Sequence, residues 1–158
     1  MSKKLVAYFS ASGTTKTPAE KLAKLLKCDI YEIKPKTKYT TADLNWNDAK
    51  SRTTIECKDR NCRPELADKD AKIANYDTII LGFPIWWYVA PNIILSFLES
   101  YDFTGKKIVL FATSGGSQFG ETAAEIKKVA KGATVVEGSL FNGGHKKDAD
   151  YQKLIQSL

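Results

Sequence analysis

The stretch Leu5–Thr15 constrains the fold more than any other part of the chain. It reads LVAYFSASGTT, so an apolar run typical of a buried strand gives way to small hydroxyl residues and one glycine. A helical pattern follows directly, which predicts a loop joining a strand to the N-terminus of a helix. Backbone N–H groups there lack intrahelical partners and the helix dipole favours an anion, so this geometry is typical of phosphate binding.

The side chains of this loop fit that interpretation. Gly13 allows a tight turn and a close approach to a ligand. Four residues add hydroxyl donors: Ser10, Ser12, Thr14 and Thr15. The alternative is an ordinary N-cap, in which Ser12 or Thr14 caps the helix and binds nothing. GxxxxGK[ST] and GxGxxG are both absent, which excludes a P-loop NTPase and leaves a dinucleotide-binding Rossmann fingerprint without support.

Length and composition favour one soluble domain over residues 1–158. Hydrophobic residues make up 43% of the chain and charged residues 27%, which is ordinary for a globular protein. No apolar run reaches the roughly 18 residues of a membrane span. The N-terminus leads straight into a strand and leaves no room for a signal peptide, so we expect a cytoplasmic protein. Three cysteines and a single histidine are too few for a structural zinc site, and no metal is expected.

The net charge of +6 is partly concentrated in one segment. Between Lys34 and Arg63 there are eight basic and four acidic residues. A basic surface can attract nucleic acid or an acidic partner, but no nucleic-acid motif accompanies the charge. A solvated face is the simpler interpretation, and we expect no nucleic-acid partner.

Strand and helix patterns alternate along the chain. After the strand that begins at Leu5, the predicted strands are Asp29–Ile33, Thr78–Gly82, Lys107–Ala112 and Thr134–Val136, the last resuming through Phe141 as an option. The predicted helices are Thr17–Lys27, Asn92–Glu99, Glu121–Lys131 and Lys147–Leu158. In the irregular segment between residues 34 and 77 we predict a helix over Thr41–Arg52 and a basic loop over Cys57–Pro64.

Short, continuously apolar strands alternating with helices predict an α/β fold: a three-layer, doubly wound parallel sheet. Ligands of such folds sit beyond the carboxyl ends of the strands. Three loops should meet there: Ser10–Thr15, Pro84–Tyr88 and Thr113–Ser117. The first offers an anion cradle, the second an aromatic surface and the third glycine backbone donors, which fits a ligand with a phosphate and a flat ring system. Packing in the core is the alternative for Trp86 and Trp87.

These loops resemble those of the flavodoxin-like FMN-binding family, which includes short-chain flavodoxins and flavodoxin-like oxidoreductases. The family's phosphate loop, roughly [ST]-x-[ST]-G-x-T, is matched by Ser10, Ser12, Gly13 and Thr15. The loop that flanks the flavin ring is matched by Pro84, Ile85, Trp86, Trp87 and Tyr88, and the loop on the ring's other side by Thr113, Ser114, Gly115, Gly116 and Ser117. The resemblance implies FMN as the cofactor and the strand order 2-1-3-4-5 for the five-stranded sheet.

The resemblance leaves two roles open. One is an enzyme that passes hydride from NAD(P)H to a quinone or similar acceptor, and the other is an electron carrier that docks on redox proteins. Carrier flavodoxins are typically acidic and often place a glycine beside the flavin, whereas this chain is basic and residues 83–90 contain no glycine. Both features favour the enzyme, and the basic segment suits the phosphates of NADPH. No residue stands out as a catalytic acid or base.

Two other classes of protein fit the sequence less well. A signalling receiver domain needs acidic residues at the strand ends, where this chain has Ser10 and Phe83–Pro84. A binding module without flavin is the remaining alternative. Within the aromatic loop we expect Trp87 to lie against the flavin ring and Trp86 to supply the loop's backbone contact.

Overall fold

A five-stranded parallel sheet forms the centre of the molecule, with the strand order β2-β1-β3-β4-β5. The structure is a computed structural model and describes residues 3–11, 13, 15–45, 47–59, 61–86, 89–114, 119–142 and 148–158. The strands are β1 (Lys4–Tyr8), β2 (Asp29–Glu32), β3 (Thr78–Pro84), β4 (Lys107–Ser114) and β5 (Thr134–Asn142). The predicted fold class and strand order are confirmed.

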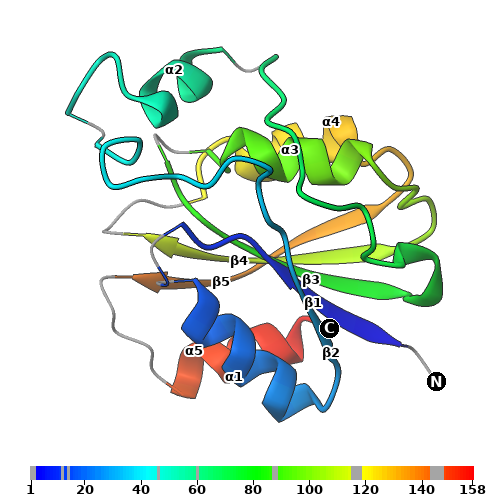
Figure 1. The fold of residues 1–158 in the computed structure, drawn as a ribbon. Coiled ribbons are helices and arrows are strands. Elements are labelled where there is room, and N and C mark those ends of the chain that lie inside the picture. The colour runs from blue at the N-terminus through cyan, green and yellow to red at the C-terminus, as the bar shows by residue number, and fades with distance from the viewer. Residues whose placement is uncertain are drawn as a thin grey trace.

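Helices cover both faces of the sheet and complete the three layers (Figure 1). One face carries α1 (Lys16–Leu26) and α5 (Asp148–Gln156), and the other carries α3 (Asn92–Glu99) and α4 (Thr122–Val129). A short helix, α2 (Arg52–Lys58), lies beyond α3 in the connection from β2 to β3, and a 3-10 turn spans Ile73–Asn75.

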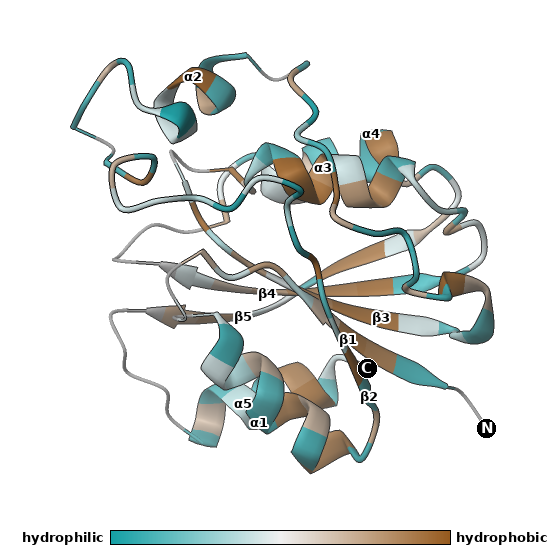
Figure 2. Ribbon diagram, in the orientation of Figure 1, coloured by the Kyte–Doolittle hydropathy of each residue, from teal (hydrophilic) through white to brown (hydrophobic). Residues whose placement is uncertain are grey.

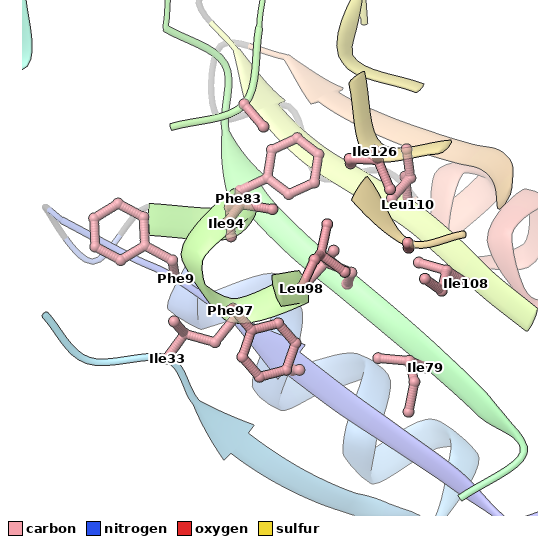
Figure 3. Close-up of a cluster of buried hydrophobic side chains, with 14 of the residues drawn as sticks. Phe9, Ile33, Ile79, Phe83, Ile94, Phe97, Leu98, Ile108, Leu110 and Ile126 are labelled. Atoms are coloured by element: carbon pink, nitrogen blue, oxygen red, sulfur yellow. The ribbon is translucent and has the colours of Figure 1, made fainter. Parts of the chain in front are cut away.

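Alternating side chains along the strands divide the core into two clusters. In β1, Leu5 and Ala7 face α3 and α4, whereas Val6 and Tyr8 face α1 and α5. Figure 3 shows the first cluster, in which Phe97 of α3 and other apolar side chains pack against the sheet. Figure 2 shows hydrophobic residues along the strands, whereas the helices mix hydrophobic and hydrophilic residues. Because each buried Leu, Ile or Phe contributes about 1.5–3 kcal/mol, burial on both faces fixes the sheet and therefore the loops at its edge.

Two glycines allow close approaches inside the sheet. A Cβ on Gly82 of β3 would lie 2.0 Å from Cζ of Phe111, so the Phe111 ring occupies the space that a side chain would need. Gly138 lies at a shift of register between β4 and β5, where a Cβ would lie 2.5 Å from the carbonyl oxygen of Leu110. This irregularity explains why the strand pattern of β5 is interrupted, and the option that it resumes through Phe141 is confirmed.

The predicted helix over Thr41–Arg52 is wrong. The structure has turns there, and α2 begins at Arg52, where the predicted helix ends. Thr40 and Asp43 exchange the reciprocal bonds of a capping box, but the turn that it starts does not continue. Beyond it, side chains compete for the backbone: Asn45 Oδ1 accepts from Asn47 N at 3.1 Å, and Asp48 Oδ1 accepts from Lys50 N at 2.9 Å. Such local bonds favour turns over helix. Ser51 is the N-cap of α2, which therefore overlaps the segment predicted as an irregular loop from Cys57.

The connection between β2 and β3 closes on itself at its base. Pro35 pairs with Leu66 in an antiparallel bridge, Lys36 N donates to the Glu65 carbonyl at 2.9 Å, and Ala67 N donates to the Lys34 carbonyl at 2.8 Å. We call this pairing of residues 34–36 with residues 65–67 the stem. Everything between its two arms, α2 included, therefore leaves and rejoins the sheet edge at one place.

Candidate functional site

The carboxyl ends of β1, β3 and β4 lie side by side at one edge of the sheet (Figure 1). From β1 the chain passes to β2 on one side of β1, and it then crosses to β3 on the other side. This reversal is the point at which doubly wound folds bind their ligands.

Thr113, near the end of β4, contacts the loops that follow β1 and β3. Its Oγ1 lies 2.8 Å from Oγ1 of Thr15, and both side chains are buried. Its carbonyl oxygen accepts a hydrogen bond from Ile85 N at 2.9 Å. One residue therefore holds the described parts of all three loops together, and Pro84, the last residue of β3, pairs with Thr113 in the sheet.

The loop after β1 presents polar groups with no partner from the described part of the chain. Ser10 Oγ is buried and makes no hydrogen bond there. Thr15 is the N-cap residue of α1, but its hydroxyl bonds Thr113 and makes no capping bond to the helix. Gly13 has φ = 87°, a left-handed conformation that favours glycine. No side chain of the described residues caps the N-terminus of α1, so backbone N–H groups of its first turn are available to an acceptor. Ser12 and Thr14 lie outside the described residues.

The aromatic loop after β3 turns tightly between Trp86 and Val89, which exchange backbone hydrogen bonds of 2.9 and 3.2 Å. The Trp86 ring packs edge-on against Phe9 at 5.8 Å and against Tyr39 at 5.6 Å. The Trp86 ring is therefore held in place by aromatic contacts within the chain, and the expected backbone contact of Trp86 with the flavin stays a prediction. Five of the predicted site residues lie outside the described residues: Trp87, Tyr88, Gly115, Gly116 and Ser117.

A buried polar network in the β2–β3 connection borders this aromatic surface. The Tyr39 hydroxyl donates to Glu56 Oε1 at 2.5 Å, Arg52 Nε donates to Glu56 Oε2 at 2.9 Å, and the Arg52 guanidinium lies 3.8 Å from the centroid of the Tyr39 ring. Burial, followed by the bond to Glu56, raises the pKa of Tyr39 above its ordinary value. This network is not among the predicted site features, and its one signal in the sequence is the i,i+4 spacing of Arg52 and Glu56.

Asn92 fixes α2 to the start of α3. Its Nδ2 donates to the carbonyl oxygens of Glu56, Asp59 and Cys62 at 2.9, 2.8 and 3.0 Å, and the residue is 1% exposed. The amide therefore satisfies carbonyls at the carboxyl end of α2 that the helix cannot pair internally. Nothing in the spacing of the sequence predicts this contact across 30 to 36 residues.

A family model described as Flavodoxin matches residues 3–156 of the chain. The chain belongs to the flavodoxin family. FMN is the cofactor of that family, as the three loops predict, and the chain is an FMN-binding flavoprotein. None of the curated protein sequences is significantly similar to it.

Solved structures similar to this flavodoxin family member include two candidate flavoproteins from Bacteroides. The protein from Bacteroides eggerthii is 42% identical, with a TM-score of 0.90 and coverage of 100% of this chain and 96% of that one. The protein from Bacteroides uniformis is 44% identical, with a TM-score of 0.90 and coverage of 98% of each. A flavoprotein from Lactobacillus acidophilus, solved in complex with FMN, is 24% identical with a TM-score of 0.70 over 89% of this chain and 93% of that one, and shares the fold.

The described residues of this flavodoxin family member fit a phosphate-bearing cofactor. The buried, unpartnered hydroxyl of Ser10 and the first turn of α1 are the donors that a terminal phosphate requires. Within the described ranges, no group of His, Cys, Asp and Glu side chains is arranged to hold a metal ion. In the same part of the chain no helix has the length and apolarity needed to cross a membrane.

Proposed function

We propose that this chain is an FMN-dependent oxidoreductase that transfers hydride or electrons from NAD(P)H to a quinone or similar small acceptor. The observation that carries the proposal is the convergence on Thr113, which ties the phosphate-type loop to the aromatic loop through Thr15 Oγ1 and Ile85 N. This arrangement suits a cofactor with a phosphate at one end and a flat ring at the other.

Each loop takes a distinct role in this proposal. The phosphate would be held by Ser10, Ser12, Gly13, Thr14 and Thr15, mainly through hydroxyl and backbone donors. The ring would lie between the aromatic loop, Pro84 to Tyr88, and the segment Thr113 to Ser117. Bound FMN supplies the redox chemistry by accepting and returning hydride or electrons, whereas the protein binds, orients and shields it.

The described residues around the site offer no protein acid for the reaction. The Tyr39 hydroxyl, which is the polar group beside Trp86, is already donated to Glu56, and its raised pKa makes it a poor acid. Its role in this proposal is to fix the Tyr39 ring as a wall against Trp86 and Phe9. Protons would then come from solvent at the open edge of the site.

Two features support an enzyme rather than a dedicated electron carrier. Residues 83–90 contain no glycine, which carriers often place beside the ring. A pocket with a lysine-rich rim also adjoins Ser10 and Tyr39, and it suits an anionic small molecule.

The test is to purify the protein, record its absorbance spectrum and identify the released cofactor, and then to measure NADPH and NADH oxidation with a quinone or dye acceptor. We expect a yellow protein that releases FMN and turns over faster than free FMN. Turnover equal to that of free FMN, with rapid electron exchange to a redox protein, would contradict the enzyme and assign the carrier role. A colourless protein that takes up no added FMN would overturn the whole assignment.

A further inference from the structure

A pocket on the outer side of β1 shares Ser10 and Ala11 of the phosphate-type loop with the candidate cofactor site. It has a volume of about 440 Å³ and lies between the ends of β1 and β2, whereas the loops after β3 and β4 lie on the other side of β1. The aromatic ring of Tyr39 lines the pocket and also contacts Trp86. A molecule in this pocket would therefore extend toward the aromatic loop.

The lining combines an apolar floor with a cationic rim. Phe9, Pro35 and the Tyr39 ring supply apolar surface. Three exposed lysines, Lys34, Lys36 and Lys38, lie along one side, and Glu32 is the acidic residue in the lining. The stem holds Lys34 and Lys36 in place through backbone bonds to Ala67 and Glu65.

Two of the three lysines carry charge that the rest of the described chain does not neutralise by contact. Lys36 Nζ lies 3.1 Å from Glu65 Oε2. Among the described residues, Lys34 and Lys38 make no ion pair within 4.0 Å. An apolar floor beside unpaired cations is the chemistry that receives a nucleotide, with its base or ribose on the floor and a phosphate at the rim.

We infer that this pocket binds a phosphate group of the reduced nicotinamide dinucleotide, with Lys34 and Lys38 as the phosphate contacts. The inference rests on the proposed function, because it gives the position of the hydride donor in that reaction. The phosphate is either the 2′-phosphate that distinguishes NADPH or the pyrophosphate that NADPH and NADH share.

The experiment measures binding without turnover. FMN-loaded protein is titrated with 2′,5′-ADP, ADP and adenosine, with dissociation constants measured by calorimetry. The variant Lys34→Gln with Lys38→Gln should raise the dissociation constant of the nucleotide about tenfold, since each exposed charge pair contributes up to about a fivefold effect. The control Lys127→Gln with Lys128→Gln, on exposed positions of α4, changes the net charge equally and should leave binding unchanged.

The three probes separate the sources of the phosphate. Loss confined to 2′,5′-ADP supports a site for the 2′-phosphate, and equal loss for ADP supports a site for the pyrophosphate. The inference is overturned if both lysine variants weaken binding equally, if neither does, or if loading with FMN abolishes nucleotide binding to this pocket. Nucleotide binding without NADPH oxidation would contradict the proposed function alone, whereas NADPH oxidation without an effect of Lys34 and Lys38 would contradict this inference alone.

Discussion

The hydroxyl oxygens of Thr15 and Thr113 lie 2.8 Å apart although 98 residues separate them in the chain. Both side chains are buried, so neither hydroxyl has water as a ready substitute for its partner. This bond joins the loop after β1 to the end of β4.

A double-mutant cycle tests this bond. Thr15→Val and Thr113→Val should each lower the free energy of unfolding by about 1–2 kcal/mol, because each leaves one buried hydroxyl unpaired. The loss of unfolding free energy in the double variant should be about 1 kcal/mol smaller than the sum of the two single losses, as measured by urea unfolding. Thr15→Val combined with Thr53→Val, whose hydroxyl donates to the Asp43 carbonyl, should be additive. Additivity in the Thr15–Thr113 pair as well would contradict the coupling.

Ser10→Ala should weaken FMN while leaving the cofactor-free protein as stable as before. Ser10 Oγ is buried without a partner in the described chain, so its removal sacrifices no internal bond, whereas a bond to a charged phosphate contributes about 1.5–3 kcal/mol. Ser139→Ala is the matched control, because Ser139 Oγ donates to the Asp150 carbonyl at 2.6 Å. That variant should lose about 1 kcal/mol of unfolding free energy and keep its FMN affinity. Unchanged FMN affinity in Ser10→Ala would remove Ser10 from the cradle.

Asn92→Ala should release α2 from the start of α3. The substitution leaves the carbonyls of Glu56, Asp59 and Cys62 without their amide donor, at a cost of about 1–3 kcal/mol. Limited trypsin digestion, followed by mass spectrometry, should show faster cleavage after Lys58, at the end of α2. Ser96→Ala, which removes only a 3.4 Å bond inside α3, should be cleaved at the rate of the unaltered protein. Equal cleavage rates for all three proteins would show that Asn92 does not hold α2.

Gly82→Ala should destabilise the sheet by about 1–3 kcal/mol, because the added methyl group would lie 2.0 Å from Phe111 Cζ. Phe111→Leu should recover part of that loss when the two are combined, as measured by thermal and urea unfolding. Gly105→Ala is the comparison, since Gly105 has φ = 76° and open space around its Cβ position. The stability lost in Gly105→Ala should not be recovered by Phe111→Leu. Recovery in that combination would contradict a specific contact between Gly82 and Phe111.

Alkaline pH should reveal the state of Tyr39. Its pKa is raised above the ordinary value of 10.0, so the folded chain keeps the phenol proton to higher pH than the unfolded chain. The stabilisation is complete below about pH 10 and is lost as the pH rises above it, by at most about 1.4 kcal/mol per pH unit for one proton. Tyr39→Phe should therefore lose unfolding free energy less steeply between pH 10 and pH 11. The same slope in both proteins would contradict the shift.

The sheet was predictable because its determinants are local. Runs such as Leu5–Phe9 and Thr78–Gly82 are apolar on both faces, which requires helices on both sides and hence a parallel sheet. The strand order needed the additional resemblance of the three loops. The site was predictable as a meeting of loops for the same reason, because parallel strands deliver their carboxyl ends to one edge.

The connection between β2 and β3 was not predictable from the same signals. Its helix starts only at Arg52 because Asn45 and Asp48 bond the backbone two residues ahead of them. The spacing of apolar residues does not reveal that competition. The contact of Tyr39 with Trp86 joins residues 47 positions apart, and no periodicity encodes it. The wall of the site formed by Tyr39 therefore depends on packing between distant residues, which the patterns of the three loops do not predict.

The stem brings the two ends of the segment between residues 36 and 65 close together. Because residues 34–36 pair with residues 65–67, the intervening segment begins and ends at neighbouring points, and doubling the length of a flexible loop closed in this way costs only about 0.6 kcal/mol. The segment can therefore change in size and charge without rebuilding the five strands, as long as Tyr39 keeps its contacts with Phe9 and Trp86. A change of size or charge between the two arms of the stem therefore alters the surface beside the candidate site without altering the order or pairing of the five strands.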